Sequence, residues 1–214
     1  KSFFILNTKI KLKIMSNLEY QTDEIRNFYS KNRVRWNDFY DSERRVFENI
    51  GIKDTTKVLD IGCGCGGLGL ALKDKFNVKN YTGIEISKLA SESAKKLNPQ
   101  ANIHNIDFLK SDRQNFGNFD LVISLSCIDW NIEFNAMFQK AWSFLEQGNF
   151  VLSLRLVNDE GVSDINKSYQ FINFQGELSG EIAPYNIFNY QKWLNLAKTL
   201  PGLSNIYGYG YYGK

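Results

Sequence analysis

The residues best suited to chemistry in this 214-residue chain form a glycine-rich run directly after an acid. An apolar stretch over 58–61 carries Asp60, and a helical apolar pattern begins near Leu68. The glycines between them are Gly62, Gly64, Gly66 and Gly67. A strand that passes through a glycine turn into a helix opens a nucleotide-binding α/β domain, because glycine permits a sharp turn and close approach of a ligand. We therefore expect this turn to hold a nucleotide-like cofactor.

The glycine turn fits two patterns. Gly62-x-Gly64-x-x-Gly67 satisfies the dinucleotide pattern of nicotinamide-dependent oxidoreductases. Asp60-x-Gly62-x-Gly64-x-Gly66 resembles the first motif of the class I S-adenosylmethionine-dependent methyltransferases. Only this resemblance gives Asp60 a role, which is to help hold the turn and the cationic end of the cofactor. The simpler alternative is that Asp60 merely ends a strand.

A second acid follows at the distance that a ribose contact requires. The segment 80–86 reads as a strand, and Glu85 near its end lies 23 positions after Gly62. An acid at about this offset binds ribose hydroxyls and disfavours a cofactor with a 2′-phosphate. By the resemblance, Ile86 would lie against the adenine. An exposed glutamate at a strand end is the competing interpretation.

Two more predicted strands complete the resemblance. The third spans 101–106 and is followed by Asp107 and Phe108, where the family has an acid that accepts from the adenine amino group. The fourth spans 119–124, ends at Ser124 and is fully apolar apart from its acid, as a central parallel strand should be.

Asp129 is the candidate catalytic residue. It lies just before Trp130 in the loop after the fourth strand, where many small-molecule methyltransferases carry a histidine. A general base is needed only if the acceptor must first lose a proton. The alternative is that Asp129 caps a helix starting near Ile132. The Asn/Asp-Pro-Pro-Tyr motif of methylation on bases or glutamine is absent, which favours a small-molecule acceptor.

An N-terminal helical segment over 20–50 would close over the cofactor if the resemblance holds. Its candidates are Tyr29, Arg33, Arg35 and Trp36, and we assign Arg35 to the methionine carboxylate. Ordinary core aromatics and solvated arginines are the alternative. The cofactor-binding residues that the resemblance implies are Asp60, Gly62, Cys63, Gly64, Gly66, Glu85, Ile86, Asp107, Phe108, Ser124 and Arg35.

Composition limits the other possibilities. Hydrophobic residues make up 43% and charged residues 23%, which is ordinary for a globular protein. The net charge is +3, but the first fourteen residues supply four lysines and no acid, so the body is not basic and nucleic acid is not expected as its main partner. No apolar run approaches the about 20 residues of a membrane span. Three cysteines and one histidine favour neither a disulfide framework nor a metal site, and indicate a reducing cytoplasm.

We predict a Rossmann-like three-layer α/β/α sandwich with a mostly parallel sheet. We interpret 1–14 as a flexible extension ahead of Met15, 15–54 as a helical cap and 55–214 as the cofactor-binding domain. We expect Gly148 to end a helix, 149–156 to form a fifth strand, 157–186 to shape the substrate pocket, and 203–212 to form a sixth strand.

The resemblance implies the strand order 3-2-1-4-5-7-6. Only six strands can be placed, so we expect the seventh to be missing from this chain. We predict a methyltransferase that uses S-adenosylmethionine. A nicotinamide oxidoreductase and a non-catalytic cofactor-binding relative are the alternatives.

Overall fold

The computed structural model describes residues 17, 19, 22–173 and 176–210. Its centre is a five-stranded sheet in the order β3-β2-β1-β4-β5, with every neighbouring pair parallel. The strands are β1 Lys57–Ile61, β2 Asn80–Glu85, β3 Asn102–Asn105, β4 Phe119–Ser124 and β5 Leu145–Leu152. The predicted order is confirmed for these five strands.

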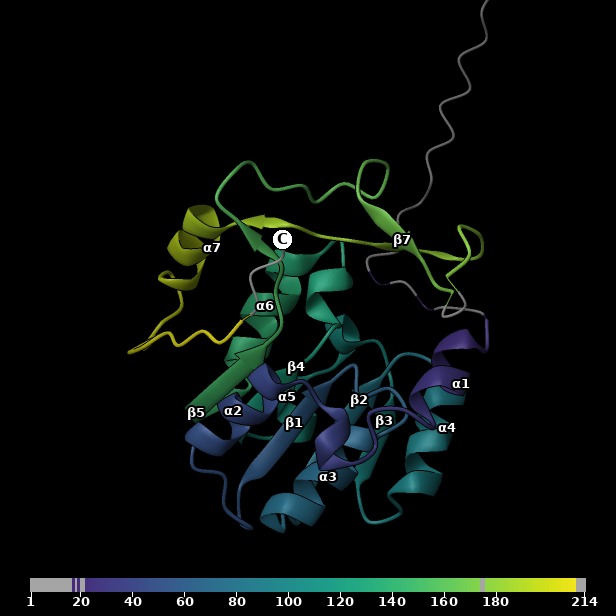
Figure 1. Ribbon diagram of the computed structural model, residues 1–214. Helices are drawn as coiled ribbons and strands as arrows, with labels where there is room; N and C mark the ends of the chain where they lie inside the picture. The colour runs from purple at the N-terminus through teal and green to yellow at the C-terminus, as the bar shows by residue number, and fades with distance from the viewer. Residues whose placement is uncertain (1–16, 18, 20–21, 174–175, 211–214) are drawn as a thin grey trace, which may run out of the picture.

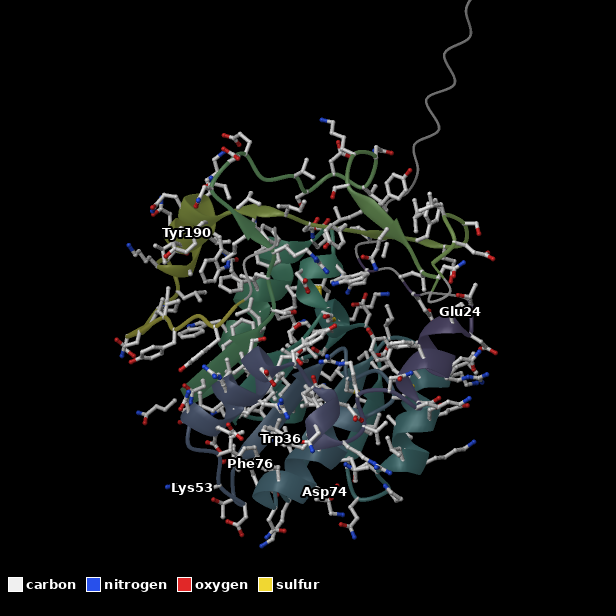
Figure 2. All side chains as sticks on the ribbon, in the orientation of Figure 1. Glu24, Trp36, Lys53, Asp74, Phe76 and Tyr190 are labelled. Carbon is white, nitrogen blue, oxygen red and sulfur yellow. The ribbon has the colours of Figure 1, made fainter. Side chains whose placement is uncertain are left out.

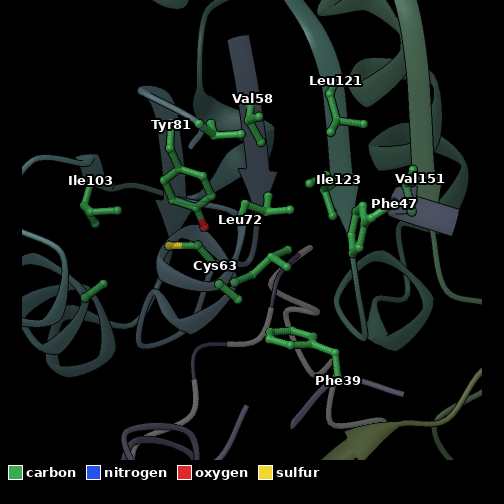
Figure 3. Close-up of a cluster of buried hydrophobic side chains, with 14 residues drawn as sticks. Phe39, Phe47, Val58, Cys63, Leu72, Tyr81, Ile103, Leu121, Ile123 and Val151 are labelled. Atoms are coloured by element: carbon green, nitrogen blue, oxygen red, sulfur yellow. The ribbon is translucent and has the colours of Figure 1, made fainter. Parts of the chain in front are cut away.

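Helices cover both faces of this sheet, so the predicted three-layer sandwich is confirmed (Figure 1). They are α1 Glu24–Tyr29, α2 Asp41–Asn49, α3 Gly67–Phe76, α4 Lys88–Leu97, α5 Arg113–Phe116, α6 Phe134–Ser143 and α7 Tyr190–Ala197. Short 3₁₀ turns lie at η1 Trp36–Asp38, η2 Phe108–Lys110 and η3 Ile128–Trp130. One core cluster joins α2, α3 and α4 to the sheet (Figure 3), and another joins α6 and α7 to the opposite face.

Alternation along the central strands supplies both cores. In β1, Val58 belongs to the cluster on the α3 face, whereas Leu59 belongs to the cluster on the α6 face. In β4, Leu121 and Val122 divide in the same way, and all four side chains are at most 1% exposed. A strand buried on both faces needs this continuous apolar run, which is why the sequence predicted these strands clearly.

The segment after β5 is largely irregular, but it contains two small sheets. In one, β6 Leu156–Val157 pairs with β9 Phe188–Asn189; in the other, β7 Tyr169–Phe171 pairs with β8 Ile182–Pro184. Figure 1 shows β7 above the end of the main sheet, on the side where α1 lies.

The prediction that Gly148 ends a helix is wrong. The helix α6 ends at Ser143, β5 begins at Leu145, and Gly148 lies inside that strand. A Cβ atom on Gly148 would lie 1.9 Å from the backbone oxygen of Asp120. The glycine is therefore explained by close approach of two strand backbones at an irregular register, which local sequence does not reveal.

The predicted sixth strand is also absent from the described part of its range, residues 203–210. A strand requires a hydrogen-bonded neighbour, and the backbone here has no ladder partner within the described chain. Tyr209 is instead joined to α2, where Asn49 Nδ2 donates to its hydroxyl at 2.8 Å.

The predicted N-terminal helical segment consists of α1, η1 and α2 rather than one continuous run. The predicted extension over 1–14 lies outside the described residues.

Candidate functional site

A cavity of about 280 Å³ opens at the carboxyl ends of β1, β2 and β4, close to the lower end of the range for small-molecule sites. One side of it is made by the glycine turn and the residues after β2. The other side is made by the N-terminal segment, the loop after β4 and the strand β7. Of the predicted cofactor residues, the wall contains Asp60, Gly62, Cys63, Gly64, Glu85, Ile86 and Phe108.

The glycine turn is joined to its neighbours by backbone contacts. The amides of Gly62 and Cys63 both donate to the carbonyl of Ile84, at 2.8 and 3.1 Å. Gly62 has a positive φ of 72°, and a Cβ atom there would lie 2.4 Å from Cys127 Sγ. Only glycine permits both this conformation and this proximity to the loop after β4. The turn is therefore held against β2 on one side and against that loop on the other.

Gly67 allows the N-terminal segment to pack directly against the glycine turn. A Cβ atom on Gly67 would lie 2.1 Å from the backbone oxygen of Arg33. Arg33 itself has a left-handed backbone with φ 58°, and its guanidinium pairs with Glu43 at 2.8 Å. The glycine that completes the dinucleotide pattern thus serves here to pack the cap over the helix start.

Glu85 lines the cavity with its carboxylate tied to the turn. Its Oε2 accepts from the amide of Gly64 at 2.8 Å, and its Oε1 accepts from the amide of Ser87 at 2.9 Å. Burial raises the pKa of Glu85, and these amides lower it in part. The side chain has two oxygens, each with a further lone pair, so it can accept from a ligand while it holds the turn.

Asp60 is buried, with 3% of its surface exposed, yet it lines the cavity. Its Oδ2 accepts a hydrogen bond from the Tyr81 hydroxyl. Burial raises the pKa of Asp60 to about 7; the Tyr81 hydroxyl and the Arg33 charge lower it, and the Glu85 charge raises it. A carboxylate that resists ionisation in this way gains most from a cation brought to it.

Asp129, the candidate catalytic residue, is not among the residues that line the cavity. It lies in η3 with 2% of its surface exposed and forms an ion pair with Arg155 Nη1 at 2.9 Å. Burial raises its pKa to about 6, although Arg155 lowers it. The helix-cap alternative is wrong as well, because Glu133 occupies the N-cap position of α6.

Arg155 connects this pair to the cavity wall. Its guanidinium lies 3.8 Å from the ring centre of Tyr185 and 4.8 Å from that of Trp130. Trp130 lines the cavity, so the charge held by Asp129 supports an aromatic part of the wall. Asp129 and Arg155 therefore contact the cavity wall only indirectly, through the Trp130 ring against which Arg155 lies.

Four of the predicted cofactor residues lie off the wall. Arg35 is exposed beside η1, whereas Arg33 lines the cavity. Asp107 caps η2 through the amide of Leu109 and also accepts from Asn17 Nδ2.

The other two lie within the scaffold. Ser124 accepts from the amide of Ile128 at 3.1 Å and so shapes the turn after β4. Gly66 packs against Ala94, whose Cβ atom would lie 3.0 Å from a Cβ added to the glycine. Trp36, a candidate for the cap, packs on Phe76 with ring centres 5.2 Å apart (Figure 2).

Sequence reasoning missed several residues of the wall. Asn17 joins Asp107 to Asn131 by side-chain hydrogen bonds, and Asn186 donates to the carbonyl of Asn131 at 2.7 Å. Arg26 also lines the cavity, as does the segment 170–173, which belongs to the region 157–186 that was expected to shape the pocket. An isolated asparagine or arginine carries no such signal in the sequence.

No group of three His, Cys, Asp or Glu side chains stands close enough to hold a metal ion in the part of the chain that the structure describes. Within the same residues, no helix has the length and apolar character that a membrane crossing requires.

Comparison with known proteins supplies the family context. The family described as "Methyltransferase domain" matches residues 58–148, from β1 into β5. A putative methyltransferase, 235L of Invertebrate iridescent virus 6, is 28% identical over 125 residues, which cover 56% of this chain and 44% of that protein. The mitochondrial ubiquinone biosynthesis O-methyltransferase of Saccharomyces cerevisiae is 24% identical over 172 residues, which cover 77% and 52%.

A solved structure of Haemonchus contortus phosphoethanolamine N-methyltransferase 2 in complex with S-adenosyl-L-methionine aligns with a TM-score of 0.56. It is 18% identical, and the alignment covers 76% of this chain and 36% of that one. This likeness concerns the fold. The chain spans about half or less of the length of these curated relatives.

Proposed function

We propose that this chain, which belongs to the class I S-adenosylmethionine-dependent methyltransferases, transfers the methyl group of S-adenosylmethionine to a small-molecule acceptor. The observation that carries the proposal is the meeting of Asp60, the glycine turn and Glu85 on one wall of a cavity at the carboxyl ends of β1 and β2. In open α/β sheets, ligands bind at this edge.

The cofactor would lie along this wall. Glu85 would accept from the ribose hydroxyls while it holds the amide of Gly64. Asp60 would receive the cationic amino-acid end, and Arg33, in place of Arg35, would stand near the carboxylate of that end. Ile86 and Phe108 supply apolar surface for the adenine.

The reaction asks the protein mainly for alignment. A sulfonium is a good leaving group, so the acceptor must be held in line with the methyl group and water must be excluded; orientation can contribute about 7–11 kcal/mol. Tyr29, Trp130 and Phe171 line the wall opposite the glycine turn and would exclude water there. With Asp129 paired to Arg155, positioning is the catalytic contribution that the described residues support.

The expected setting is the cytoplasm. Cys63, Cys65 and Cys127 are free thiols, and a reducing compartment keeps them so. Burial raises the pKa of each, which makes them poor nucleophiles and leaves them as packing groups around the turn.

Separate titrations with S-adenosylmethionine and with NADH test the proposal. We expect saturable binding of the first and none of the second, because Gly67 is covered by the backbone of Arg33. A screen of small metabolites for acceptor-dependent release of S-adenosylhomocysteine would then identify the acceptor. Preferential binding of NADH would overturn the assignment, and binding of S-adenosylmethionine without any acceptor-dependent turnover would indicate a non-catalytic relative.

A further inference from the structure

Tyr81 places a hydroxyl group behind the cavity, inside the core. It comes from β2, is 5% exposed, and its ring belongs to the core cluster on the α3 face (Figure 3). Its hydroxyl donates to Asp60 Oδ2. Asp60 lines the cavity and Tyr81 does not. The tyrosine therefore reaches any ligand only through the carboxylate.

Gly69 leaves the space that the Tyr81 ring occupies. A Cβ atom on Gly69 would lie 2.6 Å from Tyr81 Cε1 and 2.7 Å from Cζ. Gly69 lies in α3 just after the glycine turn. Its φ is not left-handed, so its backbone conformation does not require glycine. The missing side chain lets the ring lie against the helix with its hydroxyl on Asp60.

We propose that Tyr81 is a positioning residue for the cofactor: its hydroxyl holds the Asp60 carboxylate ionised and oriented to receive the ammonium group of S-adenosylmethionine. This inference rests on the proposed function.

The charges around Asp60 support this role. Glu85 faces it from the end of β2 and opposes its ionisation; Arg33 faces it from the N-terminal segment and favours it. Burial opposes ionisation most strongly, and the Tyr81 hydroxyl works against burial, with the pKa of Asp60 reaching about 7. Above that pH the carboxylate is charged and attracts a cation; as the pH falls through it, the attraction is lost.

Tyr81→Phe removes the hydroxyl and keeps the ring, so packing against Gly69 is retained. Without the donor, the pKa of Asp60 should rise further. The pH at which affinity for S-adenosylmethionine is half lost should then move upward by about one unit, with affinity about fivefold lower at pH 7. Calorimetric titrations between pH 6 and pH 8.5 would measure this shift, with thermal unfolding to show that the variant folds.

A second ligand separates positioning from general damage. 5′-Methylthioadenosine carries the nucleoside without the amino-acid end, so its affinity should be the same for wild type and Tyr81→Phe at every pH. Asp60→Asn should abolish the pH-dependent step for S-adenosylmethionine.

Each result has one meaning. If wild type binds neither ligand, the proposed function fails. If wild type binds S-adenosylmethionine and Tyr81→Phe has the same pH profile, the role of Tyr81 fails alone. Equal weakening of both ligands would show that Tyr81 supports only the structure, which would also overturn the inference.

Discussion

The cavity has one wall built from the ends of the sheet and another built from segments that cover them, and the two are held by different contacts. In the sheet wall, Glu85 binds Gly64, 21 positions away, and backbone amides bind the carbonyl of Ile84. In the covering wall, Thr22 binds Glu181 across 159 positions, and the two strands of the hairpin β7–β8 have three residues each.

The two walls differ in the contacts that stabilise them against unfolding. The sheet wall is continuous with two apolar cores and a five-stranded ladder. The covering wall reaches these cores through single residues such as Phe39 and Ile128, and its N-terminal segment binds Glu181 through the polar side chain of Thr22. We expect damage to the sheet wall to reduce cofactor binding, and damage to the covering wall to loosen local structure, with a larger loss of stability where Asp129 pairs with Arg155.

Arg155→Met should have the largest effect on stability. It leaves Asp129 buried without its cation, which typically costs about 3–5 kcal/mol. The pKa of Asp129, already raised to about 6, would rise further in the variant. A raised carboxyl pKa means that stability is retained when the group is protonated and lost as pH rises. The deficit should therefore be large at pH 8 and small at pH 5, measured by urea unfolding.

Two controls accompany this measurement. The double variant Arg155→Met with Asp129→Asn should regain much of the lost stability, because no orphan charge remains. Lys192→Met breaks an exposed pair with Glu160 and should change stability by less than about 1 kcal/mol. An equal loss at pH 5 and pH 8 for Arg155→Met would show that its stacking on Tyr185, rather than its charge, is what matters.

Glu85→Ala should weaken binding of S-adenosylmethionine by about ten- to a hundredfold while the domain stays folded. Hydrogen bonds to a charged group are worth about 1.5–3 kcal/mol, and the variant loses those to the ribose. Calorimetry gives the affinity and circular dichroism the fold. Unchanged affinity in a folded variant would remove Glu85 from the cofactor site.

Gly67→Ala should affect both walls of the cavity, because Gly67 lies where the N-terminal segment contacts the glycine turn. Its Cβ atom would displace the backbone of Arg33, at a cost of about 1–3 kcal/mol typical of overpacking. We expect faster proteolysis in the N-terminal segment and weaker cofactor binding. Gly208→Ala is the control: like Gly67, Gly208 has no left-handed backbone, but a Cβ atom there meets nothing within 4 Å. If both variants have the same stability and cofactor affinity, the contact between Gly67 and the Arg33 backbone is unimportant.

Thr22→Val should have the smallest effect. The Thr22 hydroxyl and amide both donate to Glu181 Oε2, at 2.6 and 2.9 Å, and valine removes only the hydroxyl. An exposed contact of this kind contributes about 1 kcal/mol or less. Hydrogen exchange should accelerate in β7 and β8 without change in β1 or β2. Faster exchange in the main sheet as well would mean that the two walls are one cooperative unit.

Sequence predicted the sheet wall well for a physical reason. A buried parallel strand is apolar throughout, and the left-handed backbone at Gly62 and Gly64 favours glycine. Both features can therefore be recognised from a short stretch of sequence. The cap of α4 at Ser87 is equally local, because its hydroxyl accepts from the amide of Ala90, three residues on.

Elsewhere, spacing alone misplaced side chains. Arg33 and Arg35 are alike in the sequence, and only the structure shows that Arg33, which has a left-handed backbone, lines the cavity. Asp129 had two local interpretations, as base or as cap. The structure places Glu133 at the cap position and pairs Asp129 with Arg155, 26 positions away, which the local sequence did not reveal. Gly148 is explained by the Asp120 backbone on the neighbouring strand.

By itself, the sequence determined the cofactor half of this protein: the glycine turn, the acids at Asp60 and Glu85, and the order of the strands that carry them. These depend on backbone conformation and strand burial, which neighbouring residues dictate. Tertiary structure alone decided which polar side chains meet across the cavity and what supports them, including Tyr81 behind Asp60 and Arg155 beside Trp130. Such pairings arise when distant segments are brought together, and no spacing along the chain encodes them.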